Sequence, residues 1–270
     1  DRWVSRVFAS PHDAGTAFVS KNGFRNDDFR PFLYRTIDSG KTWTSISSNL
    51  PNAPINVIVQ DRKNRQLLVV GNDLGVFVSL DGGGRWWQLK ANLPTVAVHD
   101  LTIHPRENDL VLATYGRAIW AGDMTPLQEL SDDVLGRAVH LFDIESKARY
   151  GFSTQGMNYH LFGDKFLRVP NEPEALVVNY YLKADVSGSA QITISDPAGR
   201  SVRQATGPGR SGLNSVVVNL AGVSGRGGGA GGGRGAGPAP TPLAIGDYTV
   251  TLEVAGEKLT KTARVRERIR

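Results

Sequence analysis

The chain has 270 residues, a formal net charge of +5 at pH 7 and no cysteine. This length is enough for two ordinary domains with buried cores, and the lack of cysteine excludes a disulfide framework and a thiolate metal site. Because the cationic residues are scattered along the chain, we predict no nucleic-acid partner. No stretch approaches the roughly 20 apolar residues that cross a bilayer, so we predict no transmembrane segment. The first residue is Asp1 and not Met, and we expect it to be a fragment boundary.

The first 123 residues contain three units with a similar pattern. Residues 36–43 and 79–86 both read [S/T]-x-D-x-G-x-x-W, and their aspartates lie 43 residues apart. A period of roughly 40–50 residues is typical of a four-stranded propeller blade. Three apolar runs recur in phase in every unit, although the last unit lacks the motif. The sequence therefore predicts three successive sheets.

Within the first unit, residues 22–30 form an insertion that we expect to be a loop. It carries two aromatic side chains and several charged ones. Loops of this composition on a rigid scaffold commonly carry recognition. The alternative is a decorated hairpin with no binding role. The candidate recognition residues are Phe24, Arg25, Phe29 and Arg30.

Each repeated motif predicts a tight turn between two antiparallel strands. Its Asp can accept hydrogen bonds from backbone N–H groups of the same turn, and its Gly can supply a positive φ. We expect its Trp to pack the start of the next strand against the blade. Catalytic or calcium-binding aspartates are the alternative, which we disfavour because one Asp per repeat is what architecture alone would produce. The residues that we interpret as structural are Asp38, Gly40, Trp43, Asp81, Gly83 and Trp86.

Residues 1–123 resemble the closing blades of Asp-box (bacterial neuraminidase repeat) propellers, and are most similar to their sortilin-type and bacterial glycosyl-hydrolase-like branch. The two motifs carry this resemblance, together with four short segments that are similar to the terminal blade of that branch: residues 92–94, 99–101, 104–106 and 113–120. Tyr115 stands where a His is common in these relatives. The resemblance implies an exported bacterial protein, secreted or periplasmic. Three blades cannot close a ring, so upstream blades of the same protein or another chain must complete it.

Residues 124–164 are expected to connect two domains. Thr125-Pro126-Leu127-Gln128 predicts the start of a short helix, with Thr125 as the N-cap, Pro126 at the first helical position and Gln128 at the capping-box position. We expect this helix to end near Leu135, before Gly136.

Residues 165–270 predict a β-sandwich. The segment 246–250, Gly-Asp-Tyr-Thr-Val, resembles a strand of the immunoglobulin-like modules that end many bacterial exported proteins. Ten of the 17 residues in 222–238 are glycine, and we interpret this stretch as a flexible insertion because no strand–loop–helix pattern of a phosphate-binding loop surrounds it. Basic residues at every second position of 264–270 indicate a charge-protected strand. The expected strands are 175–182, 190–195, 201–205, 215–220, 246–254 and 258–265.

Glycoside hydrolysis is the one enzymatic alternative, because sialidase-like and xyloglucanase-like relatives of such propellers use acidic groups at strand ends. Asp73, Asp100 and Arg117 are the matching side chains here. We interpret them as structural, since the catalytic carboxylates of those relatives lie largely in earlier blades. No two of the five histidines have metal-ligand spacing. We therefore predict no catalytic residue, no cofactor and no metal.

The predicted fold is all-β, with C-terminal blades of a β-propeller followed by an immunoglobulin-like sandwich. The predicted function is a non-catalytic binding or scaffold role toward a protein or glycan partner. Part of a glycoside hydrolase is the alternative.

Overall fold

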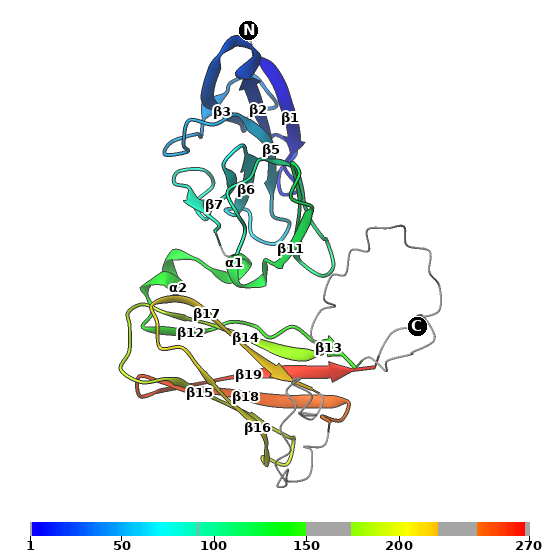
Figure 1. Ribbon diagram of the computed structural model, residues 1–270, viewed down its shortest axis with the longest axis vertical. Coiled ribbons are helices and arrows are strands. Elements are labelled where there is room, and N and C mark those ends of the chain that lie inside the picture. The colour runs from blue at the N-terminus through cyan, green and yellow to red at the C-terminus, as the bar shows by residue number, and fades with distance from the viewer. Residues whose placement is uncertain (1, 91, 150–173, 221–241, 268–270) are drawn as a thin grey trace, which may run out of the picture. The chain divides into compact units, whose positions relative to one another are not determined.

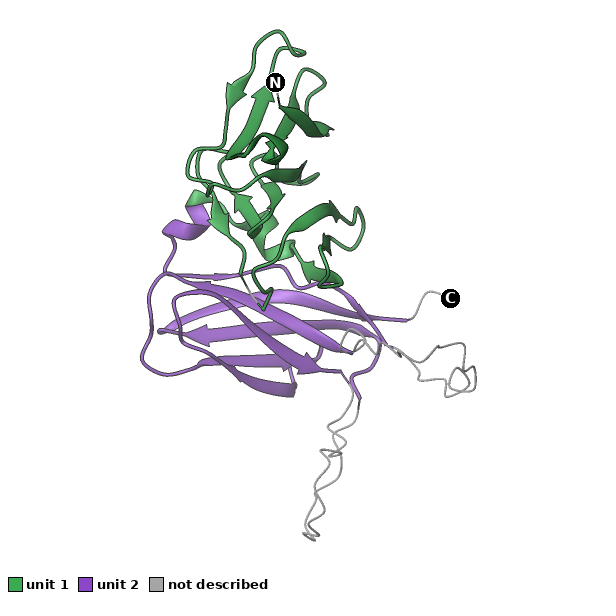
Figure 2. Cartoon of the chain, turned by 45° about the horizontal axis from the view of Figure 1, so that its top comes forward, with its two compact units in different colours: residues 1–132 green, residues 133–270 purple. Residues whose placement is uncertain are grey.

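The structure is a computed structural model that describes residues 2–90, 92–149, 174–220 and 242–267 (Figure 1). The described chain is all-β apart from short helical turns, as predicted. It divides into two units, Asp1–Asp132 and Asp133–Arg270 (Figure 2). Three antiparallel sheets form unit 1, and two sheets form unit 2.

The three sheets of unit 1 follow one another along the chain, as the repeat predicted. In each sheet the strands pair in sequence order. Sheet 1 consists of β1 (Trp3–Ala9), β2 (Ala17–Gly23), β3 (Asp28–Thr36) and β4 (Thr44–Ser45), with the 3-10 turn η1 (Phe24–Asn26) between β2 and β3. Sheet 2 consists of β5 (Ile55–Gln60), β6 (Leu68–Asn72), β7 (Gly75–Ser79) and β8 (Trp87–Gln88). Sheet 3 consists of β9 (Val98–Ile103), β10 (Asp109–Thr114) and β11 (Ile119–Asp123).

The first strands of sheets 1 and 2 lie side by side and run in the same direction. Near their starts, Ser5 Oγ donates a hydrogen bond to Ile55 O (2.6 Å). At their ends, Ser10 Oγ donates to Gln60 Oε1 (2.6 Å). This alignment brings the β2–β3 and β6–β7 hairpins to the same end of unit 1.

Sheet 3 is aligned with sheet 2 in the same way. Asn56 Nδ2, at the start of β5, donates to Val98 O at the start of β9 (3.2 Å). The β10–β11 hairpin therefore joins the other two hairpins, and we call this end of unit 1 the hairpin end. The turns 36–43 and 79–86, which we call the Asp turns, lie at the opposite end, the Asp-turn end.

Sheet 2 is buried on both faces, because it lies between sheets 1 and 3. Every residue of β6 and β7 is buried. Alternate side chains of a strand point to opposite faces, so an apolar run without polar interruptions suits a strand covered on both sides. Sheets 2 and 3 approach closely at Gly71, where a Cβ would lie 2.8 Å from Val57 Cγ1 and from Val98 Cγ1. The core between sheets 1 and 2 contains Phe18, Leu33, Ile46, Leu50, Ile55, Ile58, Leu68, Val70, Phe77 and Trp86.

The face of sheet 1 that points away from sheet 2 is uncovered. One row of paired residues across it is Val7, Val19 and Tyr34. Val7 is 63% exposed. This face of sheet 1 thus presents apolar side chains to solvent.

The two tryptophans of the repeated motif have different surroundings. Trp86 is buried, and its Nε1 donates to Ile46 O of sheet 1 (2.8 Å). The Asn49 side chain holds both the backbone N–H and the backbone carbonyl of Trp86, each at 2.8 Å. Trp43 is 43% exposed, and its Nε1 donates to Gly40 O of its own turn (3.1 Å). The motif tryptophan of sheet 2 therefore contacts the preceding sheet, whereas that of sheet 1 contacts its own turn.

The helix that we predicted from 125 to 135 is split in two, α1 (Thr125–Glu129) and α2 (Asp132–Gly136). The prediction that Thr125 is the N-cap is wrong: Met124 holds that position, and no side chain caps the helix. Asp123 Oδ1 accepts the N–H of Thr125 (2.8 Å), so the turn before the helix supplies the bond. Leu130 is extended (φ −67°, ψ 117°), and this interrupts the helix.

Unit 2 is a sandwich of two sheets, with strand orders β12-β14-β17 and β13-β19-β18-β15-β16. All six expected strands are present. Two short strands, β12 and β13, lie in the segment that we assigned to the linker, so part of that segment belongs to the sandwich. The glycine-rich residues 222–238 lie outside the described residues. The strands are β12 (Val139–Leu141), β13 (Lys147–Ala148), β14 (Ala175–Leu182), β15 (Ala190–Ser195), β16 (Ser201–Gly207), β17 (Gly212–Asn219), β18 (Gly246–Val254) and β19 (Glu257–Arg266).

Replacing the two motif tryptophans one at a time tests their unequal roles. Trp86→Phe removes the bond to the buried Ile46 carbonyl and leaves a gap between two sheets, so we expect the free energy of unfolding to fall by about 1–3 kcal/mol. Trp43 is exposed, so we expect Trp43→Phe to change the free energy of unfolding by no more than about 0.5 kcal/mol. Urea unfolding followed by far-UV circular dichroism measures both, and equal losses would show that Trp86 does not fix sheet 2 on sheet 1.

Candidate functional site

The hairpin end brings together the residues that the sequence singled out for chemistry. Asp73 lies in the β6–β7 turn, and Arg117 lies in the β10–β11 turn. Asp100 is the third residue of β9 and so lies inside a strand, near its start. The first hairpin, which carries Phe24 and Arg25, turns at this same end.

The two candidate carboxylates have separate polar partners. Asn56 Nδ2 donates to Asp73 Oδ1 (2.9 Å). Asp100 forms an ion pair with Arg6 of β1, which connects sheet 3 with sheet 1. The backbone carbonyl of Arg117 accepts the indole N–H of Trp120 (2.8 Å). Each of these residues thus has a structural contact of its own.

The recognition loop is shorter than we predicted. Phe29 and Arg30 belong to strand β3, so only residues 24–27 lie between β2 and β3. Asp27 ends the 3-10 turn with φ 55°, and its N–H donates to Phe24 O (3.1 Å). The prediction of a nine-residue loop is wrong because Gly23 pairs with Asp28 and closes the hairpin early.

Asp28 is the anion that holds this hairpin to the first strand. Arg2 Nε donates to Asp28 Oδ2 (2.9 Å), and Arg30 donates to both carboxylate oxygens (2.8 and 2.9 Å). These bonds, from Arg30 first and then Arg2, hold the pKa of Asp28 far below its ordinary value. Arg30, which we predicted for recognition, is therefore engaged with a carboxylate of its own strand.

Aromatic rings and cations alternate around the same hairpin. The guanidinium of Arg25 lies over the rings of Trp3 and Phe24, 5.5 and 5.8 Å from their centroids. Arg30 lies 5.3 Å from the centroid of Phe32. Trp3 is 64% exposed and Phe24 51% exposed. Such contacts stabilise by about 0.5–1 kcal/mol each at exposed sites, so they restrain long side chains at the surface.

Sequence reasoning missed Trp3 and Phe32 as members of this cluster. Trp3 reaches it because Trp3 pairs with Asn22 across β1 and β2. Phe32 reaches it because it pairs with Lys21 across β2 and β3. The signal in the sequence was the apolar run 3–9: if it is paired with the next strand, Trp3 lies beside the hairpin.

A second aromatic contact lies at the hairpin end in sheet 3. The rings of His99 and Tyr115 are stacked, with centroids 5.3 Å apart and planes inclined by 22°. Tyr115 is 74% exposed. Its N–H donates to Ala97 O (2.9 Å), which fixes the β10–β11 turn beside the start of β9.

At the opposite end, the first Asp turn is a closed set of hydrogen bonds. Asp38 Oδ1 accepts the backbone N–H of Thr42 (2.9 Å) and the hydroxyl of Thr36 (2.8 Å), while Asp38 Oδ2 accepts the hydroxyl of Thr42 (2.7 Å). The N–H of Gly40 donates to Thr36 Oγ1 (2.9 Å). The bonds from Thr42 and then Thr36 lower the pKa of Asp38 from the ordinary value of 3.8 to about 2.

The second Asp turn repeats this arrangement. Asp81 Oδ1 accepts the hydroxyl of Ser79 (2.7 Å) and the N–H of Arg85 (3.0 Å). Burial raises the pKa of Asp81, but these hydrogen bonds outweigh burial, and the pKa is lowered. Gly83 has φ +101°, and a Cβ there would lie 2.9 Å from Ile46 Cβ. The turn therefore needs glycine both for its backbone and for its contact with sheet 1.

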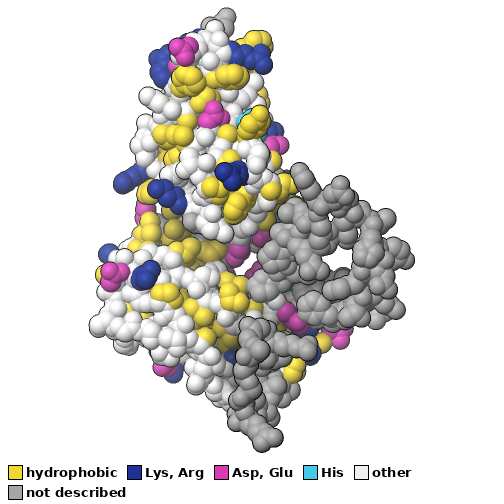
Figure 3. Space-filling view, in the orientation of Figure 1, with side chains coloured by type: hydrophobic (Ala, Val, Ile, Leu, Met, Phe, Trp, Pro, Cys, Tyr) yellow, Lys and Arg dark blue, Asp and Glu magenta, His cyan; other side chains and the backbone are white. Residues whose placement is uncertain are grey.

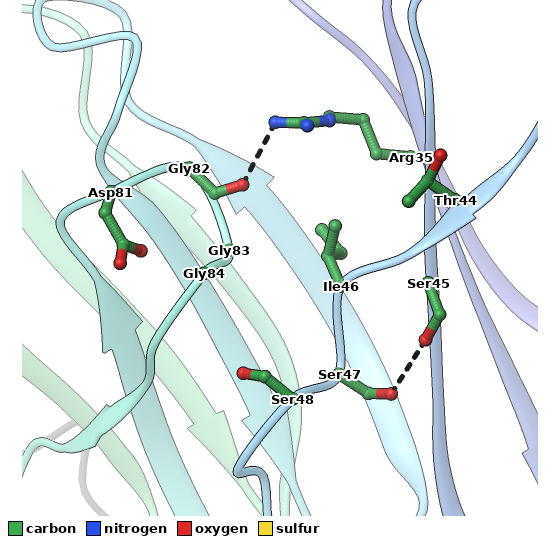
Figure 4. Close-up of a pocket in the computed structure, with 10 residues that line it drawn as sticks. All are labelled: Arg35, Thr44, Ser45, Ile46, Ser47, Ser48, Asp81, Gly82, Gly83 and Gly84. Carbon is green, nitrogen blue, oxygen red and sulfur yellow. Dashed lines mark hydrogen bonds between the residues drawn. The ribbon is translucent and has the colours of Figure 1, made fainter.

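A polar groove of about 640 Å³ lies beside the second Asp turn (Figure 4). Arg35 Nη1 donates to Gly82 O across it (3.1 Å), and the hydroxyls of Ser45 and Ser47 are 3.0 Å apart. The groove has one carboxylate, that of Asp81, which accepts hydrogen bonds from residues of its own turn. The remaining lining residues are Thr44, Ile46, Ser48, Gly83 and Gly84.

The basic strand β19 is paired with acidic side chains. Lys258 contacts Glu253, Lys261 contacts Asp143, and Arg264 contacts Asp247. Arg264 and Arg266 share one face of the strand, as the spacing predicted. Residues 268–270 lie outside the described part of the chain.

The described residues contain no group of three or more His, Asp or Glu side chains that could hold a metal ion. They also contain no helix long and apolar enough to cross a membrane.

Comparisons with known proteins add little. The sequence matches no protein-family model, and no curated protein matches it. An ancestral GH74 enzyme is similar over 97% of this chain and 24% of its own (13% identity, TM-score 0.36). The GH74 enzyme of Niastella koreensis is similar over 75% of this chain and 30% of its own (12% identity, TM-score 0.36). A BSP domain of a biofilm-associated protein covers 98% of this chain and 29% of its own (10% identity, TM-score 0.26).

The chain thus spans less than a third of each of these structures. The sheets of unit 1, and not these likenesses, carry the description of the fold.

The lowered pKa of Asp38 predicts how acid affects stability. The folded-state pKa of about 2 lies below the ordinary 3.8, so ionised Asp38 stabilises the fold above about pH 4. This contribution is lost as the pH falls from about 4 to about 2. We expect Asp38→Asn to be less stable than wild type at pH 6, with a difference that shrinks over that window. Urea unfolding at several pH values measures it, and a difference that stays constant down to pH 2 would contradict the assignment.

Proposed function

We propose that this chain is a non-catalytic binding or scaffold part of an exported bacterial protein. In this proposal, the hairpin end of unit 1 recognises a protein or glycan partner. The observation that carries it is the gathering of exposed aromatic side chains at that end: Trp3 and Phe24 in sheet 1, and Tyr115 with His99 in sheet 3. Aromatic side chains bury a large area at little cost in conformational entropy, and they dominate binding surfaces together with arginine.

The surroundings of the carboxylates support a role without catalysis. A glycosidase needs a general acid whose pKa is raised, with a second carboxylate facing it. Asp73 and Asp100 have different partners, Asn56 and Arg6. The shifted aspartate pKa values at Asp28, Asp38 and Asp81 are all lowered. These carboxylates suit structure better than proton transfer.

The proposed family is the Asp-box propellers of the sortilin-type or glycosyl-hydrolase-like branch. The hydrogen bonds of the two Asp turns and their spacing of 43 residues support it. The two-sheet sandwich supports an immunoglobulin-like module in unit 2. Secretion or a periplasmic location follows from the same proposal.

The uncovered face of sheet 1 supports a further part of the proposal, that another four-stranded sheet packs there. Sheet 2 covers the opposite face of sheet 1, and its Trp86 donates to Ile46 O. Trp43 holds the equivalent position in sheet 1 but is 43% exposed. A sheet from upstream in the same protein, or from another chain, would give Trp43 the surroundings that Trp86 has.

Substitution of exposed rings tests the binding role. Phage-displayed peptides and soluble polysaccharides, xyloglucan among them, are tested against the chain. The double variant Phe24→Ala/Tyr115→Ala is expected to fold normally and to lose at least about tenfold in affinity for the ligands found. The matched control is Trp87→Ala. It removes a ring that is 39% exposed and lies at the Asp-turn end of unit 1, next to the second Asp turn.

Undiminished binding by the double variant, or an equal loss in the control, would contradict a site at the hairpin end. Release of reducing sugar from a polysaccharide by the wild-type chain would instead favour the alternative, part of a glycoside hydrolase.

A further inference from the structure

The first hairpin contains one arginine that differs from its neighbours. Arg2 and Arg30 share the carboxylate of Asp28. Arg25 makes no ion pair with any described residue, and its guanidinium lies over the rings of Trp3 and Phe24 instead. A guanidinium has five N–H donors in its plane, and stacking on a ring uses none of them. Arg25 therefore retains its full capacity to bind an acceptor.

The two rings also restrain Arg25. One cost of using a long exposed side chain in binding is the loss of its rotamer freedom. Contacts at 5.5 and 5.8 Å with two rings reduce that freedom before a ligand arrives. A planar guanidinium held in this way matches a carboxylate in bidentate geometry.

The charge of the hairpin favours an acidic ligand. The cluster contains four cations, Arg2, Lys21, Arg25 and Arg30, and two anions, Asp27 and Asp28. Figure 3 shows Lys and Arg side chains beside hydrophobic ones at the end of unit 1 that carries the N-terminus. A net positive patch attracts acidic segments and speeds their association, most strongly at low salt.

The exposed apolar groups of the hairpin and of the start of β1 distinguish a protein ligand from a polysaccharide. Trp3, Val4, Phe24 and Phe29 are each between 49% and 64% exposed. Aliphatic or aromatic side chains of a partner can cover them, whereas a uronic-acid glycan offers carboxylates without such groups. Interfaces between proteins are enriched in the combination of aromatic residues and arginine.

We infer that Arg25, which lies over the rings of Trp3 and Phe24, is the carboxylate-binding centre of a docking surface for an acidic protein segment that also carries apolar side chains. This inference rests on the proposed binding role of the hairpin end and names the partner class for its first hairpin.

The test uses the immobilised chain and three soluble polymers: poly(Glu,Tyr), poly(Glu) and polygalacturonate. Biolayer interferometry at low salt is expected to show binding in the order poly(Glu,Tyr), poly(Glu), polygalacturonate, and to weaken as salt is added. Arg25→Ala is expected to lower the affinity for poly(Glu,Tyr) at least about tenfold. Arg25→Lys keeps the charge but loses the planar fork, so we expect an intermediate loss.

Arg85→Ala is the matched control, because Arg85 also lies over an exposed ring, 5.4 Å from the Trp87 centroid, but at the Asp-turn end. Its affinity should equal that of wild type. Thermal melting of each variant checks the fold, and little change is expected because Arg25 is exposed.

Three results would overturn the inference: no binding of poly(Glu,Tyr) by wild type, equal binding by Arg25→Ala, or tighter binding of polygalacturonate that needs Arg25. The inference and the proposed function can fail separately. If Phe24→Ala/Tyr115→Ala loses its ligands while Arg25→Ala does not, the binding end stands and the acidic partner does not.

Discussion

The contact of Trp86 with sheet 1 is the constraint on which the arrangement of unit 1 depends. A buried indole that donates to Ile46 O, with Asn49 holding the backbone of Trp86, fixes both the distance and the register between two sheets. A one-residue slip would leave these polar groups buried without partners, at a cost of about 1–3 kcal/mol for each. Because the register is fixed, β1 and β5 begin at the same level, and their hairpins turn at one end. The surface proposed for binding is a consequence of this alignment.

Spacing and apolar runs were enough to predict the sheets, because β6 and β7 are buried along their whole length and each Asp turn carries its own Asp and Gly. The two strands missing from the prediction, β12 and β13, have three and two residues, too few to show an alternation. The wrong N-cap has a local cause: the side chain of Asp123 accepts the N–H of Thr125, so the side-chain bond at the start of the helix comes from Asp123 and not from the Thr125 hydroxyl. The cation–aromatic cluster could not be predicted, because it depends on how Trp3 registers against Asn22 beside a bulge at Val4 and Arg6.

The first hairpin uses different arginines for structure and for the proposed binding. Asp28 is only 10% exposed in its side chain, and a carboxylate in that position needs compensation, which Arg2 and Arg30 supply. These bonds hold the hairpin closed against β1. Arg25 lies in the turn between β2 and β3. Among the described residues, no acidic side chain forms an ion pair with it. Arg25 lies three residues before Asp28 and five before Arg30. A substitution of Arg25 can therefore alter binding without removing the bonds that Asp28 makes.

Residues at equivalent positions of a repeat contribute differently to stability, because neighbouring sheets bury them to different extents. Trp43 and Trp86 occupy the same place in the same motif, yet one is 43% and the other 3% exposed. A repeat array gains most of its stability at interfaces between neighbours, so a sheet with one uncovered face has gained only part of it. Val7 and Trp43 are exposed apolar groups of sheet 1. A covering sheet would stabilise them by roughly 25 cal/mol for each Å² of apolar surface that it buries. In the isolated chain this apolar face is exposed to water. At the hairpin end, by contrast, arginine side chains already lie over exposed aromatic rings, and these contacts stabilise the exposed surface. The proposed binding surface and the uncovered face of sheet 1 are neighbours, and Lys21, which lies over the ring of Tyr34, borders both.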